Sequence, residues 1–578
     1  MLPRQKRLTR AAWSAVAVTL VSVFASLVVR WFSITKDFTV PADGQYGIRY
    51  WEVARNAFLR GDGFPLWDRA VCAGYPFLGN PDTPLVSSLV AGIFRIHGDA
   101  MHRWYPTVFA ALGVAGTYLW ARRSLRVSFV PALFAGILFV ASGFVSLHGA
   151  VRMPFAPFMA IPWVLFFAHE GEHDIRAAAG SGAVLGLMLL EGALFPFCFA
   201  LVALAVVTGP RFFARDTTAL AVLRVLGILT VTCVLIGAWK MFPVMAQLAR
   251  APRALKDLDA GPFSDIIPML GDSDRGAMPG RHYHVNEFRG YIGPFAFGMA
   301  IAGAGVCLIL KPRRIGLALL LLVAIILTRG AFGPYAPWSL LTRLPPFDQL
   351  QVPSRFVVLV DLAAAVCAGI ALDAAGRAVK RPLLVLPLFL AGLCALYDPI
   401  NAGQKALKAN TTDPWLPRPD PSMGKYQLVA GDDFGRMATY PARNVGAPAC
   451  HKAWPYPEGT GYAIGDVPQG GVDNGRASNV DVHQNVTIVD AVLNAPGALH
   501  LNQNFDPDFV TSVGAIRRSP RGTLDVALPA GSHHIEIRYR PRGMIAGLVA
   551  TILGLLVVVG TFVLSALSAR RRRSMRRS

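Results

Sequence analysis

The chain has 578 residues, of which 53% are hydrophobic and 16% charged, a balance typical of repeated apolar segments and unlike that of a soluble enzyme. The formal net charge of +21 could indicate a nucleic-acid partner. However, Lys and Arg cluster at the ends of apolar segments, as membrane topology requires, so composition predicts a membrane protein without a nucleic-acid partner.

Twelve apolar segments are predicted to cross the membrane as helices. The first follows a basic N-terminus and is longer than the apolar region of a signal peptide, so we interpret it as a retained helix. The twelve segments cover residues 11–32, 103–121, 128–148, 154–168, 177–191, 193–209, 219–239, 290–310, 314–329, 355–376, 382–398 and 543–567. Residues 84–97 are also apolar, and we interpret them as a helix along the outer leaflet, because a span there would invert every later loop.

The positive charges orient these segments. An even number of spans places both termini on one side, and the basic tail ARRRRSMRR marks that side as cytoplasmic. The sequence therefore predicts a polytopic α-helical protein of the bacterial cytoplasmic membrane with an outer β-rich domain. Its parts are a membrane domain (1–398) with a long first outer loop (33–102), an outer domain (399–542), and a last helix with a basic tail (543–578).

The outer domain is predicted to contain strands. Pro, Gly, Asn and Asp dominate its composition, and no long apolar segment occurs in it. Residues alternate between apolar and polar in 498–505, 522–531 and 533–541, which favours a small β-sandwich. Of the seven cysteines, Cys72 and Cys450 both lie in outer polar segments, so a disulfide between them would require an oxidising compartment. The sequence leaves that disulfide open.

The first outer loop is the richest source of candidate catalytic groups. An acid that is partly desolvated among aromatic rings has a raised pKa and can take a proton from a hydroxyl group. The loop contains Asp37, Asp43, Glu52, Asp62, Asp68 and Asp82, together with Trp51 and Trp67. The aromatic rings could stack on sugars or could form an interfacial belt. No Walker loop, GxSxG or HExxH pattern is present.

Two arginines are predicted near the outer membrane surface, Arg152 in SLHGAVRMP and Arg355 in FDQLQVPSRF. A guanidinium group there can bind the phosphate of a polyprenyl carrier through two hydrogen bonds. For Arg152 the alternative is an anchor whose charged end reaches toward the water.

Several segments together resemble the bacterial YfhO-like membrane proteins. These segments are GDGFPLWD and GYPFLGNPDT in the first outer loop, NEFRGYIG before a later helix, FDQLQVPSRF, and LPAGSHHIEIRYRP before the last helix. That family is similar to the GT-C glycosyltransferases, which take a sugar from a polyprenyl-phosphate carrier on the outer face of the membrane.

The resemblance implies roles for particular residues. It implies a catalytic acid at Asp43, with Asp37 as its nearest rival, and a second polar residue at Glu287. The substrate-binding residues implied or suggested are His148, Arg152, Arg355, Trp67, Asn80 and Tyr291. Many GT-C proteins carry adjacent acids in the first loop, whereas Asp37 and Asp43 are separated. No cofactor is certain, and a need for a divalent cation such as Mg²⁺ or Mn²⁺ stays open.

We therefore expect an inverting sugar transferase that uses a polyprenyl-phosphate donor and an envelope glycan, lipid or protein as acceptor, within the lipid bilayer. A transporter or flippase is one alternative, although ionisable residues within the predicted spans are scarce. A noncatalytic envelope-assembly protein is the other, for which the acids of the first loop would be dispensable.

Overall fold

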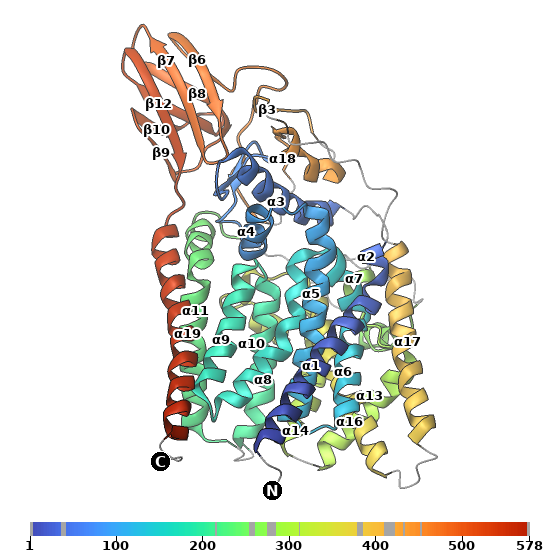
Figure 1. Cartoon of the computed structure of the whole chain (residues 1–578). Helices are drawn as coiled ribbons and strands as arrows, with labels where there is room; N and C mark the ends of the chain where they lie inside the picture. Colours follow the sequence, from blue (N-terminus) through green and yellow to red (C-terminus); the bar gives the residue numbers. More distant parts are fainter. Residues whose placement is uncertain are drawn as a thin grey trace.

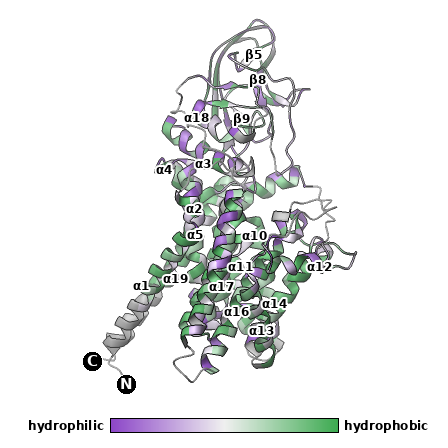
Figure 2. Ribbon diagram, turned by 90° about the vertical axis from the view of Figure 1, so that its right-hand side faces the viewer, coloured by the Kyte–Doolittle hydropathy of each residue, from purple (hydrophilic) through white to green (hydrophobic). Residues whose placement is uncertain are grey.

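Long helices form a bundle that carries a β-domain at one end, and both chain termini lie at the opposite end (Figure 1). The computed structural model describes residues 4–35, 42–213, 217–253, 261–273, 285–310, 312–378, 385–409, 422, 424–431, 434–450 and 454–574. Hydrophobic residues dominate the bundle, and hydrophilic residues gather at the β-domain end (Figure 2).

A helix or a pair of helices covers each of the twelve apolar segments. The long helices are α1 (Arg4–Val29), α5 (Gly98–Leu119), α6 (Phe129–Ala141) with α7 (Gly143–Val151), α8 (Ile161–Gly171), α9 (Ile175–Leu190), α10 (Leu194–Phe213), α11 (Ala219–Arg250), α13 (Pro294–Leu310), α14 (Pro312–Thr328), α16 (Val357–Ala378), α17 (Val385–Ala409) and α19 (Met544–Ser574). Short elements between them are η1 (Trp120–Ser124), η2 (Met153–Ala160), α12 (Phe263–Ile266), η3 (Pro268–Leu270), η4 (Val285–Phe288), α15 (Pro337–Leu341), η5 (Phe347–Gln349) and η6 (Pro353–Phe356).

Fewer than twelve of the described helices meet the criteria of length and composition for a membrane span. Within the described residues, four helices are long and apolar enough to cross a membrane, and the pair α6–α7, bent by 52°, would make a fifth. These four cover Leu194–Phe212, Ala219–Arg250, Pro353–Ala378 and Met544–Val563. The predicted twelve spans are not confirmed, because several apolar helices have only 10–17 residues and a span needs about 20.

The first outer loop is folded rather than extended. It contains α2 (Trp31–Thr35), α3 (Ala42–Arg60), β1 (Trp67–Asp68), β2 (Tyr75–Pro76) and α4 (Leu85–Ile93). A buried ion pair between Arg49 and Asp68, 2.5 Å long, ties α3 to β1. The helix α4 falls within the segment expected along the leaflet, and it ends beside the exposed side chain of Phe94.

The outer domain contains a β-sandwich, as the alternating patterns predict. Its two antiparallel four-stranded sheets have the orders β10-β11-β8-β5 and β6-β7-β12-β9. The strands are β5 (Gly470–Val472), β6 (Gly475–Val482), β7 (Val486–Leu493), β8 (Gly497–Asn504), β9 (Phe509–Thr511), β10 (Ala515–Arg518), β11 (Thr523–Leu528) and β12 (Gly531–Tyr539). Before the sandwich lie β3 (Gln427–Leu428), η8 (Phe434–Thr439), α18 (Tyr440–Arg443) and β4 (Val445–Gly446). At the N-terminal boundary of the predicted outer domain (399–542), α17 continues beyond residue 398 to Ala409.

The first outer loop and the outer domain are packed together. A disulfide joins Cys72 to Cys450, a pairing that the sequence left open. The guanidinium group of Arg69 donates hydrogen bonds to the carbonyl oxygen of His483 (2.7 Å) and to Thr487 Oγ1 (2.9 Å). This joint holds the loop at the end of the bundle, where the candidate site lies.

Candidate functional site

Two arginines and one glutamate meet at the β-domain end of the bundle. Arg152 follows α7, which ends where Pro154 prevents its continuation as an α-helix. Glu287 lies in η4, and its Oε1 is 2.5 Å from Nη1 of Arg152. Its Oε2 accepts a hydrogen bond from Nε of Arg355 in η6 (3.0 Å). One carboxylate between two guanidinium groups leaves these three described residues with a net positive charge.

The surroundings of Glu287 determine its ionisation. Burial acts to raise its pKa, but the charges of Arg355, His148 and Arg152 outweigh burial and lower the pKa well below its usual value. Glu287 is therefore an ionised carboxylate at neutral pH and a weak proton acceptor. Of the residues predicted for the site, the structure brings together these four: Glu287, Arg152, Arg355 and His148.

A cavity of about 280 Å³ opens beside this cluster. Three guanidinium groups, one described carboxyl group and several aromatic rings line it. The lining residues are Tyr46, Gly47, Tyr50, Asp82, Arg152, Met153, Pro154, Phe155, Phe195, Arg253, Gln351, Val352, Arg355 and Trp454. We call this space the arginine cavity. Its charge suits an anionic group, and its rings suit the face of a sugar.

Aromatic rings and hydrogen bonds hold the guanidinium groups in place. The guanidinium group of Arg355 lies 4.8 Å from the ring centroids of both Phe155 and Phe195. That of Arg253 lies 4.7 Å from the ring of Trp454, and its Nη2 donates a hydrogen bond to Gln351 Oε1 (2.9 Å). The cations are thereby oriented before any ligand enters.

Asp82 supplies the carboxyl group of the arginine cavity. Its backbone N–H donates to Asn80 Oδ1 (3.1 Å), which fixes the turn after the motif GYPFLGNPDT. Burial raises the pKa of Asp82, and the nearby indole N–H of Trp454 together with the charges of Arg253, Lys240 and Arg355 opposes that rise only in part. A carboxyl group with a raised pKa is a stronger base once it is ionised.

Tyr46 and Tyr50 of α3 form another wall of the arginine cavity, and hydrogen bonds from Asn80 orient their hydroxyl groups. The fully buried Asn80 donates from Nδ2 to the hydroxyl oxygens of Tyr46 (3.3 Å) and Tyr50. Nζ of Lys240 donates to the carbonyl oxygen of Asn80 at 2.5 Å. The predicted substrate-binding residue Asn80 thus positions lining residues and does not itself line the cavity.

The two leading candidates for the catalytic acid are Asp37 and Asp43. Asp37 lies outside the described residues. Asp43 is the second residue of α3, and its position shares a helix face with Tyr46, Gly47 and Tyr50, which line the arginine cavity. The helical period therefore places position 43 one turn before the wall of that cavity.

Trp67 and Tyr291 lie away from the arginine cavity. Trp67 is fully buried, with ring centroids 4.9 Å from Phe509 and 4.7 Å from Tyr539, so it has no face open to a sugar. Its place is in the joint between the first loop and the β-sandwich. Tyr291 lines a second cavity, where its hydroxyl donates to Asp398 Oδ2 (2.7 Å).

Asp82, Arg253 and Trp454 are among the lining residues that the sequence did not assign to the site. Asp82 was one of six loop acids and carried no distinguishing pattern. Arg253 lies three residues beyond the end of α11, and Trp454 lies in a Pro-rich segment of the outer domain. A polar cation directly after a long apolar helix and a tryptophan in an outer segment are weak signals that could have marked the last two.

The described residues offer a poor donor set for a metal in the arginine cavity. Mg²⁺ and Mn²⁺ require several oxygen ligands, whereas one described carboxyl group faces three arginines there. The described group with ligand-like spacing is Glu52, His97 and Asp99, which does not line this cavity. Nη2 of Arg55 lies 3.1 Å from Nε2 of His97, so a cation already occupies that neighbourhood.

An apolar groove of about 440 Å³ adjoins the arginine cavity. Its lining residues are Pro81, Leu189, Gly192, Leu194, Phe197, Lys240, Met241, Val244, Met245, Leu248, Pro345, Pro346, Asp348 and Gln349. Arg253 connects the two spaces, since its Nη1 donates to the carbonyl oxygen of Gln349 (3.3 Å) while its Nη2 bonds Gln351. Most of the groove's lining comes from the helices α10 and α11 and the end of α9. Charged and apolar binding surfaces therefore meet at Arg253.

No protein-family model matches the chain, and no curated protein matches its sequence. Among solved structures, the arabinofuranosyltransferase AftD from Mycobacteria aligns with a TM-score of 0.46 and 15% identity, over 68% of this chain and 27% of AftD. ArnT from Cupriavidus metallidurans in the apo state aligns with a TM-score of 0.46 and 14% identity, over 76% of this chain and 87% of ArnT.

The oligosaccharyltransferase of Archaeoglobus fulgidus, tethered with an acceptor peptide, aligns with a TM-score of 0.43 and 12% identity, over 75% of this chain and 63% of that enzyme. This chain thus spans about a quarter of AftD and less than two thirds of the archaeal enzyme. All three TM-scores lie below 0.5, so these likenesses do not assign an activity. The resemblance to the YfhO-like proteins is not confirmed and stays a prediction from sequence.

Proposed function

We propose that the protein is a membrane glycosyltransferase that moves a sugar from a polyprenyl-phosphate donor to an envelope acceptor on the outer face of the bacterial cytoplasmic membrane. The observation that carries this proposal is the arginine cavity, where Arg152, Arg253 and Arg355 surround a space that also contains Asp82. The adjoining apolar groove supports it, because a lipid-linked phosphate needs both kinds of surface.

The arginines would bind the donor phosphate and stabilise it as the leaving group. Negative charge on the phosphate increases as the bond to the sugar breaks, and preoriented cations lower the energy of that state. Glu287 binds two of the three arginines and is already ionised, so we assign it a positioning role. Its carboxylate keeps Arg152 and Arg355 apart and oriented.

The polyprenyl chain would lie in the apolar groove. Burial of a hydrocarbon chain contributes about 0.8 kcal/mol per CH₂ group taken out of water, although a chain arriving from lipid gains less. The groove between the helices therefore serves mainly to orient the carrier. Arg253, at the junction of groove and cavity, would contact the phosphate at the head of that chain.

The base would take the proton from the acceptor hydroxyl. We assign this role to Asp82, because it is the described carboxyl group that lines the cavity and its pKa is raised. The acceptor oxygen then forms a bond to the anomeric carbon, and the carbon–oxygen bond to the phosphate breaks with inversion. The lipid phosphate leaves with the electron pair. Asp43 is the second acid proposed for this step, from its position on α3.

Sugar transfer in membranes tests the proposal. Radiolabelled polyprenyl-phosphate sugars are supplied to membranes that contain the wild type, Asp82→Asn, Asp43→Asn or the control Asp466→Asn, whose side chain is exposed on the outer domain. We expect label in an envelope acceptor for the wild type and the control, and a loss of about 10²–10⁴-fold for Asp82→Asn. Loss in Asp43→Asn alone would move the base to Asp43. No transfer by the wild type from any such donor would overturn the proposed activity.

A further inference from the structure

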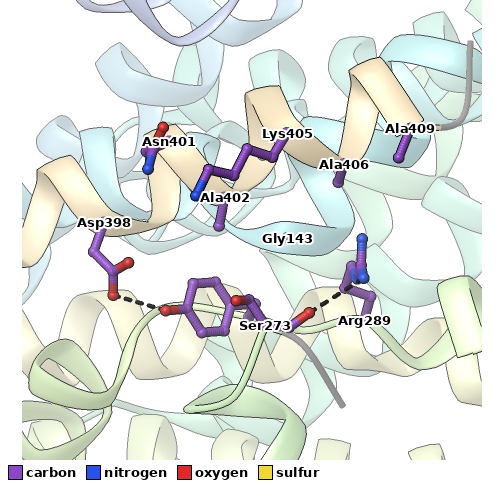
Figure 3. Close-up of a pocket in the computed structure, with 11 residues that line it drawn as sticks. Gly143, Ser273, Arg289, Asp398, Asn401, Ala402, Lys405, Ala406 and Ala409 are labelled. Atoms are coloured by element: carbon purple, nitrogen blue, oxygen red, sulfur yellow. Dashed lines mark hydrogen bonds between the residues drawn. The ribbon is translucent and has the colours of Figure 1, made fainter. Parts of the chain in front are cut away.

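A second cavity, of about 230 Å³, lies beside the helix α17 (Figure 3). It lies between α17, the start of α7 and the segment that precedes α13. The lining residues are Gly143, Ser273, Arg289, Tyr291, Asp398, Asn401, Ala402, Gly403, Lys405, Ala406 and Ala409. We call it the α17 cavity. None of the residues that line the arginine cavity lines this one.

The segment before α13 separates the two cavities. Glu287 turns toward Arg152 and Arg355, whereas Arg289 and Tyr291 line the α17 cavity. The backbone N–H of Gly143 donates to the carbonyl oxygen of Tyr291 (2.7 Å), which fixes this segment against the start of α7. A Cβ at position 143 would lie 2.9 Å from the backbone nitrogen of Tyr291, so the close approach requires glycine.

Two cations and one acid line the α17 cavity. Figure 3 shows Lys405 extending from α17 on one side, with Arg289 on the other. Nη2 of Arg289 donates to the carbonyl oxygen of Ser273 (3.2 Å), which orients the guanidinium group. The acid is Asp398, whose Oδ2 accepts a hydrogen bond from the hydroxyl of Tyr291 (2.7 Å). The described lining residues therefore carry a net positive charge, and the amide of Asn401 adds a neutral hydrogen-bonding group.

The size and position of the cavity limit the ligand. A volume of about 230 Å³ is near the lower end of the range for small-molecule cavities and suits a small head group. The first half of α17 is apolar, and the cavity follows its polar second half from Asp398 to Ala409. That change of polarity is typical of the boundary between lipid and water.

We propose that the α17 cavity is a second anion site, which binds the phosphate of a small head group through Lys405 and Arg289. A bilayer phospholipid and a soluble phosphate ester both carry this chemistry. The inference does not depend on sugar transfer, because it rests on residues outside the arginine cavity and is tested by binding alone.

Binding to the full-length protein, followed by native mass spectrometry in detergent, tests the site. The probes are short-chain phosphatidylglycerol, glycerol phosphate, and a neutral glucosyl diacylglycerol that lacks phosphate. Lys405→Gln is compared with the wild type and with Lys408→Gln, a matched control on the exposed surface of the same helix that does not line the cavity. Lys405 is exposed, so its substitution leaves the fold intact. A second variant, Asn401→Ala, removes a neutral contact.

We expect Lys405→Gln to weaken binding of a phosphate-bearing probe about tenfold, as the loss of one charge-assisted hydrogen bond predicts. Asn401→Ala should weaken it less, and Lys408→Gln should bind as the wild type does. A loss seen with phosphatidylglycerol alone identifies a lipid head group, and a loss also seen with glycerol phosphate identifies a soluble ester. Equal losses in Lys405→Gln and Lys408→Gln, no loss in Lys405→Gln, or equal binding of the phosphate-free glycolipid would each overturn the proposal.

Discussion

Replacing Glu287 with Gln should destabilise the protein. The substitution keeps the shape of the side chain but removes the charge that faces Arg152 at 2.5 Å and Arg355 at 3.0 Å. Both guanidinium groups would then repel each other without the carboxylate between them. An amide can accept one of the two sets of hydrogen bonds, but it cannot offset either positive charge.

The size of this loss follows from the burial of the cluster. Removing one partner of a fully buried ion pair costs about 3–5 kcal/mol. The side chains of Arg152 and Arg355 keep 25% and 12% of their surface exposed, so water can solvate part of each charge. We therefore expect Glu287→Gln to lower the free energy of unfolding by about 2–3 kcal/mol.

The dependence on pH gives a second readout. The charges of the neighbouring cations lower the pKa of Glu287 from 4.5 despite its burial, so the ionised form stabilises the folded state. That stabilisation is fully present above about pH 4.5 and is lost as the pH falls toward the folded-state pKa. The difference in the free energy of unfolding between wild type and Glu287→Gln should thus be constant near neutral pH and should become smaller at lower pH.

Thermal unfolding of the purified protein in detergent, between pH 3 and pH 8, measures both effects. Asp466→Asn serves as the control, since it removes one exposed carboxylate without touching the cluster. The double variant Arg152→Gln/Glu287→Gln should recover part of the loss, because it removes one of the two uncompensated cations. An unchanged Tm for Glu287→Gln at pH 7, or a difference that does not narrow below pH 4.5, would refute the electrostatic argument.

Three further predictions concern the joint and the cavity. Trp67→Ala should cost about 3–5 kcal/mol of stability, measured by thermal unfolding, while Trp67→Phe should cost less; a variant that loses only sugar transfer and no stability would instead indicate a ligand contact. Cys72→Ser, compared with Cys450→Ser, should lower stability by about 2–4 kcal/mol in an oxidising buffer and by nothing in a reducing one; an effect that persists after reduction would contradict this. Arg253→Gln should raise the KM for the lipid donor about tenfold or more with little loss of stability, and an unchanged KM would remove Arg253 from donor binding.

The sequence predicted the helices well because long apolar segments leave few alternatives in a membrane. Each of the twelve predicted segments is a helix or a helix pair. The number of membrane spans was harder to predict. Hydropathy locates an apolar helix but does not show whether that helix crosses the whole bilayer. The helix over Ile175–Leu190, for example, has 16 residues.

The site was predictable where short motifs carried it. Arg152, Glu287 and Arg355 were chosen from three separate segments, and the structure brings both arginines within hydrogen-bonding distance of Glu287. Asp82 and Trp454 could not be paired in advance, because their proximity arises from the packing of the outer domain onto the first loop. No periodicity within either segment predicts that Asp82 and Trp454 lie close together.

The disulfide sets an order of events during synthesis. Cys72 and Cys450 are separated by 378 residues, so at about 5–20 residues per second Cys72 would wait roughly 20–75 s for its partner. The other five cysteines all lie within helices of the bundle: Cys198, Cys233, Cys307, Cys367 and Cys394. Cys72 and Cys450 are the two cysteines at the joint outside the bundle, and the cavity wall that contains Trp454 is the last to be added. A newly made chain acquires its complete arginine cavity only after the membrane helices up to α17 have been synthesised.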